Sequence, residues 1–164
     1  MNFCYECGAE LIEMPLDGEG EIPFCERCGR FRFPIFSTAV SMEVLSPARD
    51  KIVLIKQYGK DKNILVAGYV NKGESAEEAV SREVREELGV AVGEIRFNKS
   101  AYFEPSNTLM LNFSCVADTE ELHINEKEVD SAAWYTLGEI EKEIFQGSLA
   151  HKFLAEFLLK NKAE

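Results

Sequence analysis

Residues 68–90 read GYVNKGESAEEAVSREVREELGV and combine a glycine-containing loop, a helix start signal and a helix rich in carboxylates. Ser75, followed three residues later by Glu78, is typical of a capping box, which satisfies the first free backbone N–H groups of a helix. Gly89 is suited to end that helix in the left-handed conformation. The stretch therefore predicts a loop, a helix that begins after Ser75 and ends before Gly89, and a second loop.

Three glutamates of this helix, Glu83, Glu86 and Glu87, are spaced i, i+3 and i+4 and so project from one face. Their negative charges repel one another, and Arg82 and Arg85 relieve only part of that repulsion. A divalent cation would relieve it better, because hard cations such as Mg²⁺ bind carboxylate oxygens and bridge to substrate phosphates. From the helix alone, a metal site and a plain acidic surface are both possible.

The full spacing resembles the Nudix box at every defined position. Those positions are Gly68, Glu74, Arg82, Glu83, Glu86, Glu87 and Gly89. The resemblance implies an α/β fold, the Nudix α/β/α sandwich with a mixed sheet, and cleavage of a nucleoside diphosphate linked to another moiety. It also implies that Glu83, Glu86 and Glu87 hold Mg²⁺ or Mn²⁺, while Gly68, Glu74 and Arg82 support the box structurally.

The chemistry agrees with this resemblance. A phosphoanhydride is cut when water attacks one phosphorus and negative charge builds on the surrounding oxygens. Metal ions orient the water, lower its pKa and neutralise that charge. One carboxylate can accept the proton from water, and the spacing does not decide which one.

Four cysteines near the N-terminus form two CxxC pairs that are 17 residues apart: Cys4, Cys7, Cys25 and Cys28. This spacing predicts a four-cysteine zinc site, which is closed and structural. Gly8 and Gly29 follow the pairs, where a tight turn needs a permissive backbone. Two disulfides or an iron site are the alternatives. Cys115 stands apart in an apolar run, where we expect a buried small residue.

The sequence predicts two domains, a zinc ribbon at 1–33 and a second domain at 34–164 that begins with Pro34. Residues 1–33 contain few large apolar groups, so metal binding would supply their folding energy. In the second domain we expect strands near 35–45, 52–55, 64–66, 93–103, 109–117 and 134–135. A closing helix at 148–160 places Leu149, Phe153 and Phe157 on one face, as core or as a dimer contact.

The composition sets modest limits. A chain of 164 residues with 46% hydrophobic content can build one core and a small appendage. The net charge of −11 argues against broad binding to a nucleic-acid backbone, although a local basic patch is still possible. No stretch approaches the roughly 18 to 20 apolar residues of a membrane span, and the N-terminus lacks a secretion signal. We therefore expect a cytoplasmic protein without a membrane partner.

A zinc ribbon directly before a Nudix box resembles the NADH pyrophosphatase branch of the superfamily. That resemblance implies hydrolysis of NADH or NAD to NMN(H) and AMP by a homodimer. It implies that Tyr69 packs on the nicotinamide ring and that Glu128 is a further acid near the metals. It also implies that Thr108 and Met110 contribute to substrate binding, and that Ala150 and its neighbours form a substrate-lining turn contributed at the dimer interface.

The stretch 100–108, SAYFEPSNT, departs from the SQPWPFPxS sequence of that branch. Its prolines are displaced and Glu104 adds negative charge, which weakens the NADH assignment but not the pyrophosphohydrolase chemistry. Other dinucleotides, ADP-ribose-type compounds and NAD-capped RNA are therefore alternative substrates. A non-catalytic, nucleotide-sensing adaptor is the alternative from another functional class.

Overall fold

The computed structural model of the protein describes residues 2–161. The chain divides into two compact units between Phe36 and Ser37. Each unit has its own sheet, and each is described separately below.

The first unit contains a three-stranded antiparallel sheet in the order β1 (Ile12–Leu16), β2 (Gly20–Cys25), β3 (Arg30–Phe31). A tight turn joins β1 to β2, in which the Glu19 N–H donates to the Leu16 carbonyl at 2.9 Å. Among the described residues of this unit, the only buried apolar side chains are those of Cys4 and Cys25. The unit therefore has little apolar core.

The second unit is built on a six-stranded sheet in the order β7-β8-β4-β5-β9, with β6 paired to the same edge of β4 as β5. The strands are β4 (Ser37–Leu45), β5 (Lys51–Lys56), β6 (Val66–Tyr69), β7 (Val92–Phe103), β8 (Thr108–Ala117) and β9 (Ser131–Thr136). The pair β4 and β8 is parallel, whereas the other pairs are antiparallel. The sheet is thus mixed, as predicted.

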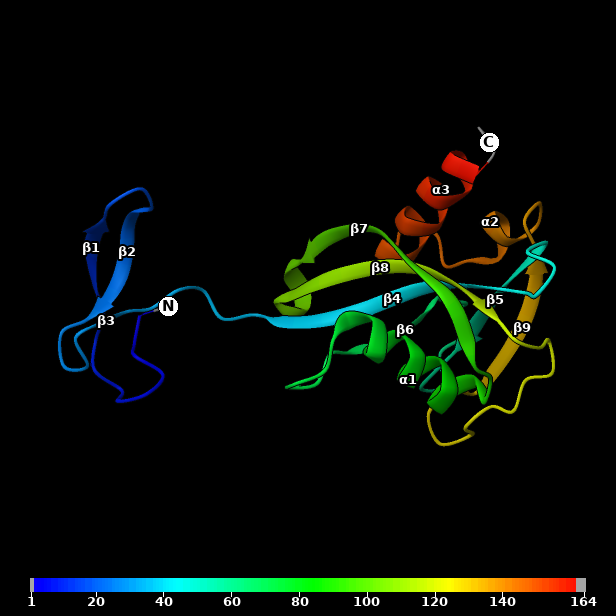
Figure 1. Ribbon diagram of the computed structural model, residues 1–164, viewed down its shortest axis with the longest axis horizontal. Coiled ribbons are helices and arrows are strands. Elements are labelled where there is room, and N and C mark those ends of the chain that lie inside the picture. Colours follow the sequence, from blue (N-terminus) through cyan, green and yellow to red (C-terminus); the bar gives the residue numbers. More distant parts are fainter. Residues whose placement is uncertain (1, 162–164) are drawn as a thin grey trace. The chain divides into compact units, whose positions relative to one another are not determined.

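Helices cover both faces of this sheet (Figure 1). Strand β5 shows the two layers, because its side chains alternate between the faces. Val53 and Ile55 pack in the cluster that contains α1 (Ala76–Leu88). Ile52 and Leu54 pack in the cluster that contains α2 (Ile140–Glu143) and α3 (Leu149–Asn161). The predicted α/β/α sandwich is confirmed.

Most predicted elements are present, with corrections at their ends. The strand predicted at 64–66 is instead β6, because Ile64 makes only an isolated bridge to Ile55 before the regular pairing with β4 begins. Helix α3 buries Phe153 and Phe157 in the core, which answers the choice between core and dimer contact for these two residues. Cys115 is buried on the α1 side, as expected. Among residues 2–161, no helix is long and apolar enough to cross a membrane.

A buried polar cluster lies on the α3 side of the sheet. The side chain of Glu43 is fully buried and accepts hydrogen bonds from the amides of Asn98, at 3.0 Å, and Asn112, at 3.2 Å. The hydroxyl of Ser114 donates in turn to Asn98 at 3.3 Å. Sequence reasoning did not find this cluster, because its members come from three different strands.

Candidate active site and metal centre

Helix α1 has the ends that the sequence predicts. The Glu78 N–H donates to the Ser75 hydroxyl at 3.2 Å, and the Ser75 N–H donates to the Glu78 carboxylate at 2.8 Å, so the capping box is closed. Gly89 ends the helix with φ 71°, in the left-handed region, and its N–H donates to the Arg85 carbonyl. Between these caps the helix holds the box glutamates in fixed positions.

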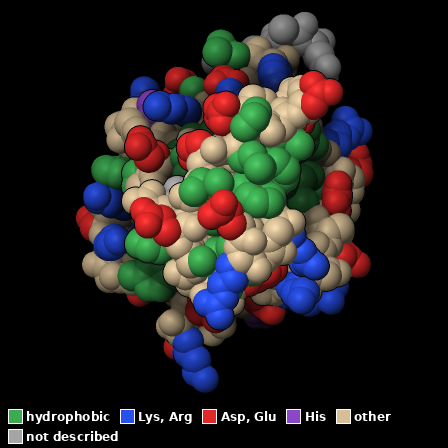
Figure 2. All heavy atoms as spheres, turned by 90° about the vertical axis from the view of Figure 1, so that its left-hand side faces the viewer, with side chains coloured by type: hydrophobic (Ala, Val, Ile, Leu, Met, Phe, Trp, Pro, Cys, Tyr) green, Lys and Arg blue, Asp and Glu red, His purple; other side chains and the backbone are tan. Residues whose placement is uncertain are grey.

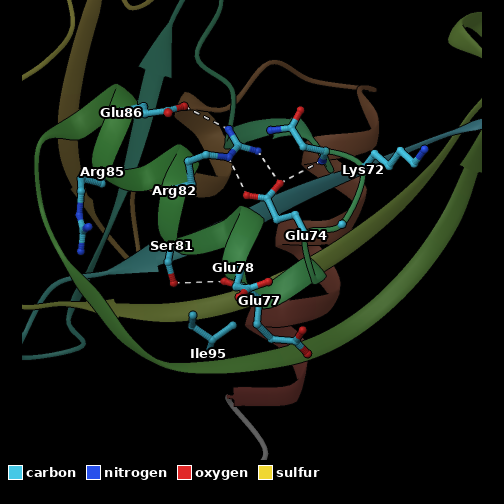
Figure 3. Close-up of a pocket in the computed structure, with 11 residues that line it drawn as sticks. Lys72, Glu74, Glu77, Glu78, Ser81, Arg82, Arg85, Glu86 and Ile95 are labelled. Atoms are coloured by element: carbon cyan, nitrogen blue, oxygen red, sulfur yellow. Dashed lines mark hydrogen bonds and ion pairs between the residues drawn. The ribbon is translucent and has the colours of Figure 1, made fainter.

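Arg82 links the loop to the helix (Figure 3). Its guanidinium makes two bonds to the Glu74 carboxylate, at 2.7 and 2.9 Å, and one to the Tyr69 carbonyl at 2.9 Å. The same group donates to Glu83 at 2.7 Å and to Glu86 at 3.1 Å. Arg82 therefore holds the loop before the helix and partly neutralises two of the box carboxylates.

Glu87 is the most buried of the box glutamates, with 4% of its surface exposed. Its Oε1 accepts a hydrogen bond from the Gln57 amide at 2.7 Å, whereas its Oε2 is buried without a partner in the described structure. Burial raises the pKa of Glu87 to about 8, the Gln57 hydrogen bond opposes this rise, and the negative charges of Glu83, Glu128 and Glu86 add to it. The carboxylates thus interact electrostatically.

Glu128 lies in the connection between β8 and β9 and interacts electrostatically with Glu83 and Glu87. The connection docks on the end of α1, where the Asn125 N–H donates to the Glu87 carbonyl at 3.1 Å. Val129 anchors it from the other side, buried in the α1 cluster. Burial also raises the pKa of Glu83, and although Arg82 opposes this rise, the charges of Glu86 and Glu128 contribute to it.

The chemistry of these donors suits a hard divalent cation, although among the described residues only the four cysteines have ligand atoms gathered closely enough to hold an ion without side-chain movement. A buried carboxylate oxygen without a donor, close to other carboxylates, is costly unless a cation or proton compensates it. Oxygen donors are the ligands that Mg²⁺ and Mn²⁺ prefer. A cation bound by Glu83 and Glu86 would compete with the Arg82 guanidinium, which would keep its bonds to Glu74 and Tyr69.

An apolar pocket of about 260 Å³ lies beside the carboxylates. It contains three of the predicted substrate-binding residues, Tyr69, Thr108 and Met110. The fourth, Ala150, is not among its lining residues, whereas its neighbour Leu149 is. The aromatic ring of Phe103 also lines the pocket, which is the right chemistry for a flat ring to stack on.

Gly68 lines this pocket and also contacts Glu83 of helix α1. A Cβ atom at Gly68 would collide with the carboxylate of Glu83, so only glycine allows that carboxylate to reach the pocket wall. Thr108 is 1% exposed and donates its hydroxyl to the Ser106 carbonyl at 3.0 Å, so the hydroxyl serves the loop after β7. That loop forms a short 3₁₀ turn at Glu104–Ser106, in which the displaced proline is the second residue.

A larger hollow of about 810 Å³ follows the outer side of α1 (Figure 3). Its lining is mostly charged and includes Glu77, Glu78, Arg85 and Lys72. The apolar pocket at Tyr69 suits a base or nicotinamide ring better, since such rings need apolar and aromatic surface.

The four N-terminal cysteines converge in the first unit. Their sulfurs all lie within 4.8 Å of one another, with 3.5 Å between Cys7 and Cys25 and 4.0 Å between Cys4 and Cys28. A disulfide needs about 2.05 Å, so no pair is bonded. Tetrahedral Zn–S bonds of about 2.3 Å place sulfurs roughly 3.8 Å apart, which matches the observed spacing.

The turns that carry these cysteines are tight, as expected. The Gly8 N–H donates to the Cys4 carbonyl and the Gly29 N–H to the Cys25 carbonyl, each at 2.8 Å, and both glycines have positive φ. Both pairs therefore present their sulfurs from similar knuckles.

Arg32 is a residue of the cysteine site that sequence reasoning missed. It is 4% exposed, and its Nε donates to the Cys4 sulfur at 3.2 Å. Its Nη2 donates to Glu6 at 2.7 Å, and the guanidinium stacks over the Tyr5 ring at 4.8 Å. Burial raises the pKa of the Cys4 thiol, but hydrogen bonds from backbone N–H groups and from Arg32 bring it down to about 6. A thiolate at Cys4 is thus favoured.

Gln57 is a second missed residue. It directly follows the last residue of strand β5, and nothing in its local sequence links it to Glu87, which lies on α1. Only the tertiary fold brings the two together. An amide directly after a buried apolar strand is a weak signal, because such a residue often only begins a loop.

Comparison with known proteins gives a consistent result. A model of the NUDIX domain matches residues 36–157. A Pseudomonas aeruginosa protein named NAD-capped RNA hydrolase NudC is 30% identical over 161 residues, which are 97% of this chain and 56% of that protein. A protein of the same name from Escherichia coli O1:K1 is 28% identical over 166 residues, 99% of this chain and 62% of that protein. The chain thus spans less than two thirds of these relatives.

Solved structures share the fold. A NUDIX hydrolase from Nitrosomonas europaea superposes with a TM-score of 0.70 at 20% identity, covering 99% of this chain and 93% of that one. The NUDIX domain of Shewanella oneidensis NrtR, complexed with ADP ribose, superposes with a TM-score of 0.64 at 14% identity, covering 86% of this chain and 94% of that one. At these identities the likeness concerns the fold alone.

Proposed function

The chain belongs to the NUDIX family, and from that premise we propose that it is a metal-dependent pyrophosphohydrolase that cleaves NADH or NAD to NMN(H) and AMP. The observation that carries the proposal is the buried Oε2 of Glu87, which has no partner in residues 2–161 and lies among other carboxylates beside an apolar pocket. Such an oxygen is costly in a structural role and useful in a site that binds a cation and water.

In this proposal Glu83, Glu86, Glu87 and Glu128 hold Mg²⁺ or Mn²⁺, which when bound neutralises the phosphates and lowers the pKa of the attacking water. The water oxygen bonds to one phosphorus of the substrate, and the bond from that phosphorus to the bridging oxygen breaks. The proton of the water passes to a carboxylate, and we assign this role to Glu87, whose Oε2 has no hydrogen-bond partner among the described residues. Gln57 fixes the other oxygen of that carboxylate.

The remaining predicted residues are given supporting roles. Tyr69 lines the pocket, has 57% of its surface exposed and would stack on the nicotinamide, and Met110 would form part of the same pocket wall. Thr108 would hold the loop after β7, and Ala150 would support the pocket through Leu149. Gly68, Glu74 and Arg82 would keep the box in shape.

The four cysteines would bind a structural zinc ion. We further propose a homodimer, by the resemblance to the NADH pyrophosphatase branch.

A substrate panel tests the activity directly. The protein would be incubated with Mg²⁺ or Mn²⁺ and with NADH, NAD, ADP-ribose, FAD or diadenosine compounds, and the products separated by chromatography. We expect a mononucleotide pair, NMN(H) and AMP, from the first two compounds. Failure to hydrolyse any member of the panel, with folded protein and both metals, would contradict the proposal.

A substitution tests the role of Glu87. We expect Glu87→Gln to lower kcat by about 100-fold or more, as for loss of a group that handles a proton, with a smaller change in KM. Glu77→Gln is the matched control, because Glu77 is exposed in the first turn of the same helix. Equal effects of the two substitutions would remove Glu87 from the mechanism.

NAD-capped RNA is a second candidate substrate, because the curated relatives quoted above carry that name. It uses the same phosphoanhydride and the same carboxylates. Capped RNA differs from NAD because an RNA chain continues from the ribose of its adenosine, and the enzyme must accommodate that chain as well.

A further inference from the structure

Two pockets each share a lining residue with a contact to a box carboxylate. The Glu83 carboxylate lies against Gly68, which lines the apolar pocket. The Glu87 carboxylate accepts a hydrogen bond from Gln57, which lines a second cavity of about 310 Å³. A substrate whose pyrophosphate lies at the carboxylates would thus extend one half toward each pocket.

The second cavity has a different lining from the first. Its walls are formed by Gln57, Tyr58, Lys60, Lys62, Ile64 and Phe145. Tyr58 exposes 76% of its surface and Phe145 exposes 40%, so both rings are accessible. The Lys62 ammonium lies 3.9 Å from the centre of the Phe145 ring, in a cation–π contact. Exposed aromatic rings beside lysines are the surface on which bases stack and phosphates bind.

The two lysines have charge to offer a ligand. Within residues 2–161, neither Lys60 nor Lys62 forms an ion pair, whereas the neighbouring Lys56 is paired with Asp61 at 2.5 Å. Acidic and basic side chains are interspersed over the face shown in Figure 2, in keeping with a net charge of −11. Against this net negative charge, the two lysines of the cavity supply positive charge for one or two phosphates rather than for a long backbone.

The cavity is held in shape by the surrounding backbone. The Gly59 N–H donates to the Asp130 carboxylate at 2.7 Å, and the Lys60 N–H donates to the Gln57 carbonyl at 3.2 Å. The Phe145 N–H donates to the Asn63 carbonyl at 2.8 Å. A preformed site loses less entropy on binding than a mobile loop would.

We propose that this second cavity binds the RNA body of a capped substrate, at the phosphodiester and base that follow the adenosine of the cap. The proposal rests on the proposed function, since it assumes a pyrophosphate at the box carboxylates. The two phosphates of NAD itself would lie at the carboxylates, so the unpaired lysines are left for a further phosphate. The exposed rings of Tyr58 and Phe145 favour a continuing chain with a base over a lone 2′-phosphate, which has no ring to stack.

The first test compares two substrates. The double variant Lys60→Gln, Lys62→Gln would be assayed with NAD and with an RNA trinucleotide that carries an NAD cap. We expect the ratio of kcat/KM for capped RNA to that for NAD to fall about tenfold. The slope of log kcat/KM for capped RNA against log salt should also become shallower, by about 1.4 if each of the two lysines contacts one phosphate of a single strand.

The matched control carries the same change in net charge elsewhere. Lys152 and Lys160 are exposed on α3, outside both pockets, so Lys152→Gln, Lys160→Gln should keep the substrate ratio of the wild type. An equal loss for NAD and capped RNA in the cavity variant would mean that the cavity holds only the AMP half, and would overturn the proposal. A loss confined to NADP, as a third substrate, would assign the lysines to a 2′-phosphate and would also overturn it.

A binding measurement separates this proposal from the hydrolase proposal. A fluorescent RNA trinucleotide with a 5′-phosphorylated adenosine and no cap would be titrated with the protein and followed by anisotropy. We expect Tyr58→Leu to weaken binding by about fivefold or more, the usual effect of losing one stacked base. Unchanged binding in both the Tyr58 and the lysine variants would overturn the RNA site even if NAD is hydrolysed. Absence of NAD hydrolysis with intact, cavity-dependent RNA binding would instead count only against the hydrolase.

Discussion

At the scale of single residues, two buried glutamates differ in how their oxygens are satisfied. Both oxygens of Glu43 accept amide hydrogens, from Asn112 and Asn98. One oxygen of Glu87 accepts from Gln57 and the other has no donor in the described chain. Burial raises the pKa of both groups to about 8, so a shifted pKa alone does not separate a structural acid from a functional one. The carboxylate oxygen that lacks a hydrogen-bond donor distinguishes Glu87 from Glu43.

Glu43 should make the stability of the second unit depend on pH. Burial raises its pKa from 4.5 to about 8, although the Asn112 amide, its own backbone N–H and the Asn98 amide oppose the rise. The folded state therefore binds the proton more tightly, and its contribution is full below about pH 4.5 and is lost as the pH rises toward 8. Glu43→Gln cannot ionise, so its free energy of unfolding relative to wild type should increase between pH 5 and 8.

Urea unfolding followed by the fluorescence of the single tryptophan, Trp134, measures this difference in the second unit. The expected change is up to about 1.4 kcal/mol per pH unit over the window. The exposed Glu104→Gln serves as the control substitution. A constant difference between Glu43→Gln and wild type would show that Glu43 does not titrate in this window.

Arg32 should set the affinity of the cysteine site for zinc. Four thiolates leave a bound Zn²⁺ with net negative charge, and the buried guanidinium on Cys4 compensates part of it. We expect Arg32→Gln to weaken zinc binding by about 10- to 100-fold, the usual effect of losing an outer-shell partner. Competition with a chromophoric chelator measures the affinity. Arg32→Lys, which keeps the charge, should lose less, and equal affinity in all three proteins would contradict the role.

At the scale of elements, α1 was the best predicted part of the chain. Its caps are local, since Ser75 and Glu78 contact each other and Gly89 closes the last turn by its own φ. The partners of the helix were not predictable in the same way. Gln57, just after β5, and Val129, in the connection between β8 and β9, meet α1 only after the sheet has formed.

The pocket shows the same limit. Tyr69, Thr108 and Met110 were predicted from a family resemblance, and the structure brings them into one cavity that Leu149, the neighbour of Ala150, also lines. The role predicted for Ala150 at a dimer interface stays a prediction, because it depends on a second copy of the chain. The arrangement of the cysteines was predicted, but the burial of Arg32 against Cys4 was not, because arginine is usually exposed.

The C-terminal cap of α1 gives a test at this scale. A Cβ at Gly89 would lie 2.6 Å from the His123 carbonyl oxygen, and the position also has positive φ. We expect Gly89→Ala to cost at least about 1–2 kcal/mol from the left-handed backbone alone, and more from the collision. Gly93→Ala should stay within about 0.5 kcal/mol, because no described atom lies within 4 Å of its Cβ position and its φ is not positive. Urea unfolding measures the free energy of unfolding of both variants. Equal values for Gly89→Ala and Gly93→Ala would argue against a stabilising cap at Gly89.

At the scale of the whole molecule, the two units depend on different sources of stability. The second unit has two apolar clusters, one on each face of its sheet. In the described part of the first unit only Cys4 and Cys25 are buried apolar residues, with one aromatic pair, Phe24 and Phe31, whose ring centres are 5.0 Å apart. So small a core does not offset the conformational entropy of some thirty residues, and metal ligation is the remaining source.

Removal of zinc should therefore unfold one unit and spare the other. Treatment with a zinc-selective chelator, with Mg²⁺ kept in the buffer, should release the backbone amides of β1 and β2 to rapid hydrogen exchange. Amides of β4 and α1 should stay protected, because their hydrogen bonds lie in the sandwich of the second unit. Mass spectrometry of peptic fragments reads both units in one experiment. Metal analysis would establish that zinc has been removed. If β1 and β2 are then still protected from exchange, the cysteine site does not hold the first unit together. Loss of protection in α1 at the same chelator concentration would mean that the two units fold as one.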